Sequence, residues 1–170
     1  MPYGHNRFVA AITATQQEAP RYHPMKITTK AFSDTHPIPR RLTADGKNVN
    51  PPLTIRGVPA EAESLVLIVD DPDAAMGTWN HWLVWNIQPG TAVIKEDSIP
   101  AGAVVGLNDA GTAKYVGPSP PSGTHRYYFR LYALDKKLDL PKGSARTELE
   151  DAMHDHILDR AELLGRYARE

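Results

Sequence analysis

The sequence predicts a mainly β fold of short strands and turns, with one helix near the C-terminus. The 170-residue chain contains 15 prolines, well above the usual share of about 5%. Because each proline inside a helix costs roughly 3 kcal/mol, a bundle of long helices is excluded. The most apolar segments are short, rich in β-branched or aromatic residues and bounded by Gly, Pro or Asp, as is typical of strands.

The first clear strand is a buried one. Residues 65–69 are a continuous apolar run, Leu-Val-Leu-Ile-Val, which is too short for a typical helix and predicts a strand buried on both faces. It ends abruptly at Asp70-Asp71-Pro72-Asp73, because Pro72 cannot donate a hydrogen bond to a sheet. Shorter strands are expected within residues 25–29 and 50–55.

Two further segments alternate with the period of a strand. In residues 125–134 one face receives His125, Tyr127, Phe129 and Leu131, and the other receives Arg126, Tyr128, Arg130 and Tyr132. In residues 81–87 the same period places four side chains on one face: His81, Leu83, Trp85 and Ile87. The segment between these strands, residues 88–123, reads mostly as loop, where binding groups tend to lie.

The pattern becomes helical after Pro141. Thr147 and Glu150 have the spacing of a capping box, and apolar residues recur at helical intervals: Leu149, Met153, Ile157, Ala161 and Leu164. The sequence therefore predicts an amphipathic C-terminal helix that packs on the sheets. Three aspartates, Asp151, Asp155 and Asp159, would form its solvated face, and we expect no metal there despite His154 and His156 nearby.

Length and composition define the class of protein. The chain fits one domain over residues 25–170, after an N-terminal extension, residues 1–24, that lacks periodicity. Lys and Arg number 19 against 20 Asp and Glu, so we expect no nucleic-acid binding. No run reaches the ~18 apolar residues of a membrane span, and no cysteine is present for disulfides, thiolate catalysis or cysteine-bound zinc. We expect a cytoplasmic protein without membrane insertion and without a cofactor.

Polar side chains gather at the ends of the predicted strands. Asp71 and Asp73 follow the buried strand and project to the same side if the chain is extended there. His81 begins the next strand, and His125 and Tyr127 share a face at the start of another. Strand ends from remote segments converge readily in an antiparallel fold, so these residues form a candidate pocket.

Each of these residues also has a simpler interpretation. Asp-Pro-Asp after a strand is commonly turn chemistry. His81 in an aromatic strand is commonly a hydrogen-bonded histidine of the core or surface, and His125 can be a solvated strand start. The motifs of a nucleophile elbow, a phosphate-binding loop and a His-Glu-x-x-His metal site are absent, and Ser119 and Ser122 follow prolines.

Two long motifs together resemble the phosphatidylethanolamine-binding protein family, in particular its bacterial and archaeal Raf kinase inhibitor-like branch. The first motif runs from Asp71-Pro72-Asp73-Ala74 to His81-Trp82. The second runs from Tyr115 through Gly117-Pro118-Ser119-Pro120-Pro121-Ser122-Gly123 and His125-Arg126-Tyr127 to Asp135. The resemblance extends from about Met25 to Tyr167 and includes Asn48-Val49-Asn50-Pro51-Pro52.

The resemblance implies an antiparallel, Greek-key-like β-sandwich with peripheral short helices and a small anion-accepting pocket at one end of the sheets. Carried over to this sequence, the pocket is lined by five side chains, Asp71, Asp73, His81, His125 and Tyr127, with Gly117 and Pro118 as a wall. The chain departs from the family at one position, because Ala75 stands where the family usually has a proline.

The expected function is the binding of a phosphate-bearing small molecule or a phospholipid head group. A carboxylate would pair with an ammonium group while imidazole, phenol and backbone N–H groups donate to the phosphate. Two alternatives stay open: a hydrolase of phosphoesters or esters with Asp71 or His81 as general base, and a protein-interaction or protease-inhibitor module that uses residues 118–121.

The resemblance also implies a homodimer. The tryptophans of one segment, Trp79, Trp82 and Trp85, could contribute to its interface, and core packing explains them at least as well. No particular protein partner follows from the sequence.

Overall fold

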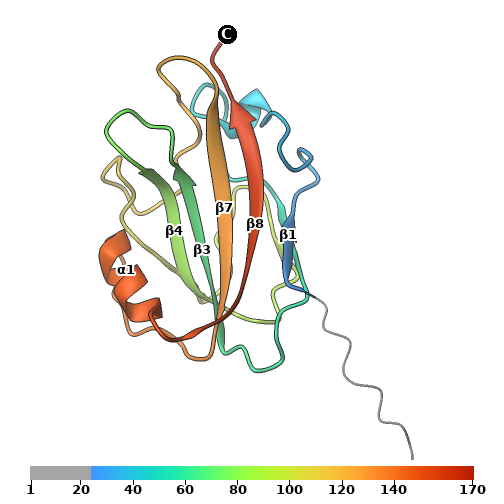
Figure 1. Cartoon of the computed structure of the whole chain (residues 1–170), viewed down its shortest axis with the longest axis vertical. Helices are drawn as coiled ribbons and strands as arrows, with labels where there is room; N and C mark the ends of the chain where they lie inside the picture. Colours follow the sequence, from blue (N-terminus) through green and yellow to red (C-terminus); the bar gives the residue numbers. More distant parts are fainter. Residues whose placement is uncertain (1–23) are drawn as a thin grey trace, which may run out of the picture.

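Two antiparallel sheets face each other in the computed structural model, which describes residues 24–170 (Figure 1). The smaller sheet has the order β1-β2-β5: β1 (Lys26–Thr28), β2 (Leu53–Arg56) and β5 (Val93–Ile94). The larger sheet has the order β6-β4-β3-β7-β8: β6 (Val104–Val105), β4 (Trp79–Ile87), β3 (Ser64–Asp71), β7 (His125–Leu134) and β8 (Ile157–Tyr167). A 3-10 helix, η1 (Arg40–Leu42), and one α-helix, α1 (Arg146–Met153), complete the described part. The predicted mainly β, antiparallel fold is confirmed.

The predicted N-terminal extension, residues 1–24, lies outside the described residues except for its last position. Within residues 24–170, no helix is long and apolar enough to cross a membrane.

The larger sheet is buried on both faces along β3 and most of β4. One face packs on the smaller sheet in a core that includes Leu67, Trp82 and Phe129. The other face is covered by α1 and the segment before it, and its core includes Ile68, Trp85 and Leu149. Strand β3 lies between the two cores and is buried at all eight positions, so the predicted strand with two buried faces is confirmed. Trp82 and Trp85 are core residues, at 1% and 0% exposure, and do not lie at an accessible interface.

Strand β4 departs from the predicted alternation because a β-bulge lies near its start. In the register with β3, Asp70 pairs with Asn80 whereas Val69 pairs with Trp82, so His81 is the extra residue between the two pairs. A bulge redirects the side chain that it carries. His81 therefore leaves the face of its neighbour Leu83 and packs edge-on against Tyr127 of β7, with 5.3 Å between the ring centroids.

A second irregularity lies near the end of β4. The register shifts between the β3 positions Leu65 and Leu67, and Asn86 opposite them has a positive φ of 55°. Beyond this point Ile87 enters the core between the sheets, while Trp85 belongs to the core under α1. The prediction that His81, Leu83, Trp85 and Ile87 share one face is thus wrong at both ends, because each bulge shifts the period of two by one residue.

The predicted C-terminal helix is correct only over its first part. Helix α1 spans Arg146–Met153 and buries Leu149 and Met153. The carboxylate of Glu148 accepts a hydrogen bond from the backbone N–H of Ala145 (2.7 Å). The cap therefore lies two residues earlier than Thr147 and Glu150 predict, and Glu150 pairs with Arg146 instead.

Residues 157–167 form strand β8 and not the second half of a helix. Asp155 has a positive φ of 63°, which ends the helical path, and β8 then pairs with β7 from Leu134 to His125. Buried Leu163 and Tyr167 alternate with exposed Glu162 and Arg166. Pairing along a whole neighbouring strand outweighs the helix propensity of this segment.

The three C-terminal aspartates consequently do not share a helix face. Asp151 lies on α1, Asp155 in the following turn and Asp159 on β8. Among residues 24–170, no group of three or more His, Cys, Asp or Glu side chains is arranged to hold a metal ion.

The close packing of β8 predicts that Gly165→Ala destabilises the fold. A Cβ at Gly165 would lie 2.4 Å from Cγ1 of Ile38 and 2.9 Å from Cε2 of Phe32. Overpacking of this kind costs about 1–3 kcal/mol, which chemical denaturation would measure. The matched control is Gly90→Ala, because a Cβ at Gly90 meets nothing within 4 Å. Equal stability of the two variants would contradict the contact.

Candidate functional site

A cavity of about 620 Å³ lies where the C-terminal end of β3 meets the N-terminal ends of β4 and β7. Residues of the loops that follow β3 and precede β7 line the cavity. These loops lie at the upper end of the molecule in Figure 1. Five of the seven predicted site residues line it: Asp71, His81, Gly117, His125 and Tyr127. The antiparallel register of β3 with β4 and β7 is what brings these strand ends together.

The carboxylate of Asp71 accepts hydrogen bonds both from the turn after β3 and from a histidine of the cavity. One carboxylate oxygen, Oδ1, accepts the backbone N–H of Asp73 (2.8 Å) and closes the turn after β3. The other oxygen, Oδ2, accepts a hydrogen bond from Nδ1 of His125 (2.7 Å). Asp71 and His125 are 4% and 9% exposed, so their mutual orientation is set before any ligand enters. The turn interpretation and the site interpretation of this motif are therefore compatible.

His81 is held in one tautomer by the cavity wall. Its Nδ1 lies 2.7 Å from the carbonyl oxygen of Val116. A carbonyl oxygen can only accept, so Nδ1 carries the hydrogen and Nε2 of the neutral ring is an acceptor. Burial lowers the pKa of His81 below its ordinary value of 6.5, against the opposing effects of the Val116 carbonyl and the Asp71 charge. The ring is consequently neutral at neutral pH.

Tyr127 supplies a buried hydroxyl whose hydrogen has no acceptor. The residue is 1% exposed, and its hydroxyl donates to no group within residues 24–170, while the nearby backbone N–H of Ser119 acts on the phenol oxygen and lowers its pKa slightly. Burial and the nearby Asp71 charge raise its pKa far above 10, so the group stays a phenol that can donate. An unsatisfied buried donor is costly, and a ligand oxygen in the cavity would relieve that cost.

Two predicted site residues do not line this cavity. Asp73 points to the neighbouring Arg126, which donates from Nη2 to Oδ1 (2.8 Å) and from Nε to Oδ2 (3.0 Å). The Arg126 side chain holds the pKa of Asp73 down at about 2. Pro118 is buried and does not line the cavity, and its carbonyl accepts a hydrogen bond from the N–H of Ala44 (3.0 Å).

The structure also places residues at the cavity that the strand-end argument missed. The loop after β3 contributes Met76, fully exposed, and Trp79 is 39% exposed at the start of β4. Asp109 comes from the long loop before β7, where its Oδ2 accepts the N–H of Asn80 (2.6 Å). Pro120, which is buried, adds a further apolar side chain to the lining. Of these residues, only Met76 could have been expected at the cavity from the sequence, because it follows the Asp-Pro-Asp motif closely.

Comparison with known proteins identifies the family of this fold and site. The family model described as "Phosphatidylethanolamine-binding protein" matches residues 28–168. A UPF0098 protein of Methanothermobacter thermautotrophicus is 49% identical over 150 residues, which cover 85% of this chain and 99% of the relative. The chain therefore belongs to the phosphatidylethanolamine-binding protein family.

Two solved structures agree with that assignment. A crystal structure of a homologue from Chlamydia trachomatis, described as a putative phosphatidylethanolamine-binding protein homologue, superposes with a TM-score of 0.83 at 43% identity. The superposition covers 86% of this chain and 99% of the Chlamydia trachomatis chain. Escherichia coli YbcL, described as a new member of the mammalian family, superposes with a TM-score of 0.82 at 27% identity over 87% of this chain and all of that one.

The environment of His81 predicts its titration in the ligand-free protein. Because the folded protein disfavours the charged ring, His81 should titrate below pH 6.5. The unfolded chain then binds the proton more readily than the folded one, so the stability contribution of this group falls as pH drops below 6.5. In Asp71→Asn, which removes a charge that raises the pKa of His81, titration should move lower still. NMR of the imidazole would measure both, and a pKa above 6.5 would contradict this environment.

Proposed function

We propose that the chain binds small phosphate-bearing molecules in the cavity formed by Asp71, His81, His125 and Tyr127. The observation that carries this proposal is the set of unused polar atoms. Both imidazoles use Nδ1 for protein contacts, and their Nε2 atoms have no hydrogen-bond partner within residues 24–170. The Tyr127 hydroxyl likewise donates to no group there. These three atoms belong to residues that line one cavity.

Anion binding in this cavity would be linked to proton uptake. A neutral imidazole with its hydrogen on Nδ1 offers only a lone pair at Nε2, which repels a phosphate oxygen. Protonation turns Nε2 into a charged donor, and charge-assisted hydrogen bonds are about twice as strong as neutral ones. The Tyr127 phenol adds a neutral donor. The bound phosphate thus stabilises the charged ring that the empty cavity disfavours.

The carboxylate and the apolar lining indicate what the rest of the ligand is. Asp71 has two oxygens with lone pairs left for a cationic group, as an ethanolamine ammonium would supply. The exposed side chains of Met76 and Trp79 and the buried Pro120 add apolar surface to the lining of the cavity, which suits an organic substituent better than a bare ion. We therefore expect O-phosphoethanolamine to bind more tightly than inorganic phosphate.

Neither alternative function is favoured by an observation of this kind. The hydroxyl of Ser119 on the cavity wall accepts a hydrogen bond from Arg169 (2.6 Å) and is not paired with an imidazole base. In the proline-rich loop, Pro118 and Pro120 are buried whereas Ser119 and Pro121 are exposed, and no contact within residues 24–170 points to a protein partner for this loop. A homodimer and a cytoplasmic location stay predictions, which light scattering and cell fractionation would test.

Removal of the Tyr127 hydroxyl should weaken binding. In Tyr127→Phe the phosphate loses one buried donor, worth about 1.4 kcal/mol, so the Kd for O-phosphoethanolamine should rise about tenfold in calorimetry. The matched control is Tyr132→Phe, because Tyr132 lies on the opposite face of β7. Unchanged affinity in Tyr127→Phe would contradict the proposed contact.

The linkage to protons predicts how affinity depends on pH. Sulfate is a suitable probe because it stays a dianion over the range of histidine titration. Above the pKa of His81 in the free protein, uptake of one proton should raise sulfate affinity about tenfold for each pH unit of acidification, with a plateau below that pKa. The His81→Gln variant should lose this slope. A flat profile in the parent protein would contradict proton-linked binding.

A separate binding experiment distinguishes a free phosphorylated molecule from a lipid head group as the ligand. Sedimentation with phosphatidylethanolamine vesicles would show whether the cavity reaches a head group at a membrane surface. Binding of O-phosphoethanolamine without binding of vesicles would assign the site to soluble ligands.

A further inference from the structure

The wall of the cavity rests on a turn that is remote in sequence. The wall, residues 115–121, contacts the turn, residues 42–48, through three hydrogen bonds. The hydroxyl of Tyr115 donates to the Leu42 carbonyl (2.9 Å), the N–H of Gly117 donates to Oδ1 of Asn48 (2.7 Å), and the N–H of Ala44 donates to the Pro118 carbonyl (3.0 Å). The contact is tight, because a Cβ on Gly117 would lie 2.7 Å from the Leu42 oxygen.

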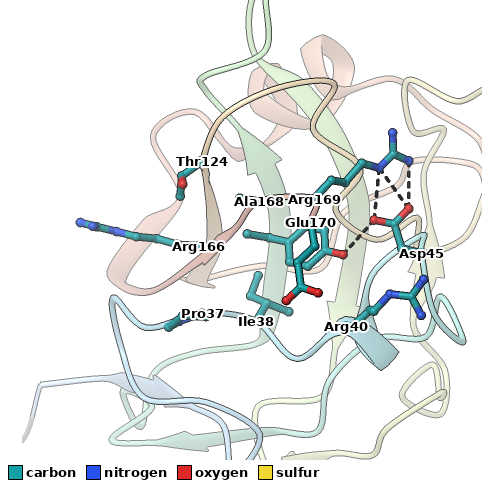
Figure 2. A pocket seen from close by; sticks show the side chains of 10 residues that line it. Pro37, Ile38, Arg40, Asp45, Thr124, Arg166, Ala168, Arg169 and Glu170 are labelled. Atoms are coloured by element: carbon teal, nitrogen blue, oxygen red, sulfur yellow. Dashed lines mark hydrogen bonds and ion pairs between the residues drawn. The ribbon is translucent and has the colours of Figure 1, made fainter.

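Arg169, which follows β8, connects this turn to the wall through hydrogen bonds. Both carboxylate oxygens of Asp45, which lies in the turn, accept hydrogen bonds from Nε of Arg169 (3.0 and 3.1 Å). Its Oδ2 also accepts a hydrogen bond from the hydroxyl of Tyr167 (2.8 Å). Figure 2 shows the carboxylate of Asp45 facing the guanidinium of Arg169. From the same guanidinium, Nη2 donates to Oγ of Ser119 in the wall (2.6 Å). Arg169 thus bridges the turn and the wall at once, and we call these four residues, Asp45, Ser119, Tyr167 and Arg169, the latch.

The latch differs from an ordinary surface ion pair. A single exposed pair stabilises a protein little, whereas a guanidinium that binds a carboxylate and a hydroxyl in fixed directions also sets geometry. Hydrogen bonds from Arg169 and Tyr167 lower the pKa of Asp45 below its usual value of 3.8. Asp45 is therefore charged at neutral pH, and the pairing with Arg169 persists there.

We propose that Arg169 is a positioning residue for the cavity, which holds the wall of residues 115–121 in place for the ligand. The carbonyl of Val116 that fixes the tautomer of His81 belongs to this wall, and so does Ser119. Displacement of the wall would free Nδ1 of His81 and widen the cavity. For its effect on ligand affinity the inference rests on the proposed function, but the effect on the wall itself does not.

A neighbouring arginine, Arg166, provides a matched control. Arg40 and Arg166 line the open groove beside the latch, a space of about 950 Å³, together with Arg169 (Figure 2). Within residues 24–170, the guanidinium of Arg166 makes no hydrogen bond or ion pair. Arg166→Gln therefore removes the same charge from the same groove without a change in the latch.

Hydrogen exchange and calorimetry on the full chain test the proposal. In Arg169→Gln the amides of Val116 and Gly117 should exchange about tenfold faster without ligand, and the Kd for O-phosphoethanolamine should rise about tenfold, as expected for loss of a charged hydrogen-bond network. Arg166→Gln should stay within about twofold of the parent in both. Arg169→Lys, which keeps the charge but not the fork, should recover part of each loss. Asp45→Asn combined with Arg169→Gln should add little, because one network is broken twice.

The outcomes are distinct. Unchanged exchange at Val116 and Gly117 in Arg169→Gln would overturn the proposal. Faster exchange with an unchanged Kd would overturn the role in ligand binding, and so would an equal rise of the Kd in Arg166→Gln, because charge alone would then explain it. If the parent chain binds no phosphate compound, the proposed function fails, and the exchange data still decide whether the latch holds the wall.

Discussion

Two consecutive buried carboxylates at the end of β3 constrain the rest of this structure. Asp70 and Asp71 are 1% and 4% exposed, and a buried carboxylate needs partners. Because successive strand residues face opposite ways, the two need different partners on the two sides of the sheet. Asp70 binds Nε of Arg130 (3.0 Å) and Nη1 of Arg146 (2.7 Å), which ties the first residue of α1 to the sheet. Asp71 binds His125.

The same constraint shapes the polar side of the cavity. The partner of Asp71 is a histidine and not an arginine, so the pair leaves an unused nitrogen at the cavity. The bulge at His81 brings a second imidazole to the same side. Strand pairing and the bulge therefore fix the positions of both rings. The latch then holds the wall that selects the tautomer of His81.

Much of the fold and part of the site could be predicted from local patterns. The apolar run of residues 65–69 and the alternation of residues 125–134 identify β3 and β7, and five of the seven predicted site residues line one cavity. The prediction of a helix beyond Met153 was wrong. Residues 157–167 have helix-forming composition, but they pair with β7 along its whole length and form a strand. Asp73 could not be placed, since its partner Arg126 comes from a strand 53 positions away.

The sequence by itself determined that this is a compact β protein with turns stiffened by proline, and that its polar residues stand at strand ends. These are properties of composition and short-range period, which a single chain segment carries alone. Only the tertiary structure decided which way His81 points, that β8 is a strand, and that Arg169 lies behind the cavity wall. Bulges, strand partners and the latch all depend on the pairing of segments remote in sequence, and no local pattern contains that information.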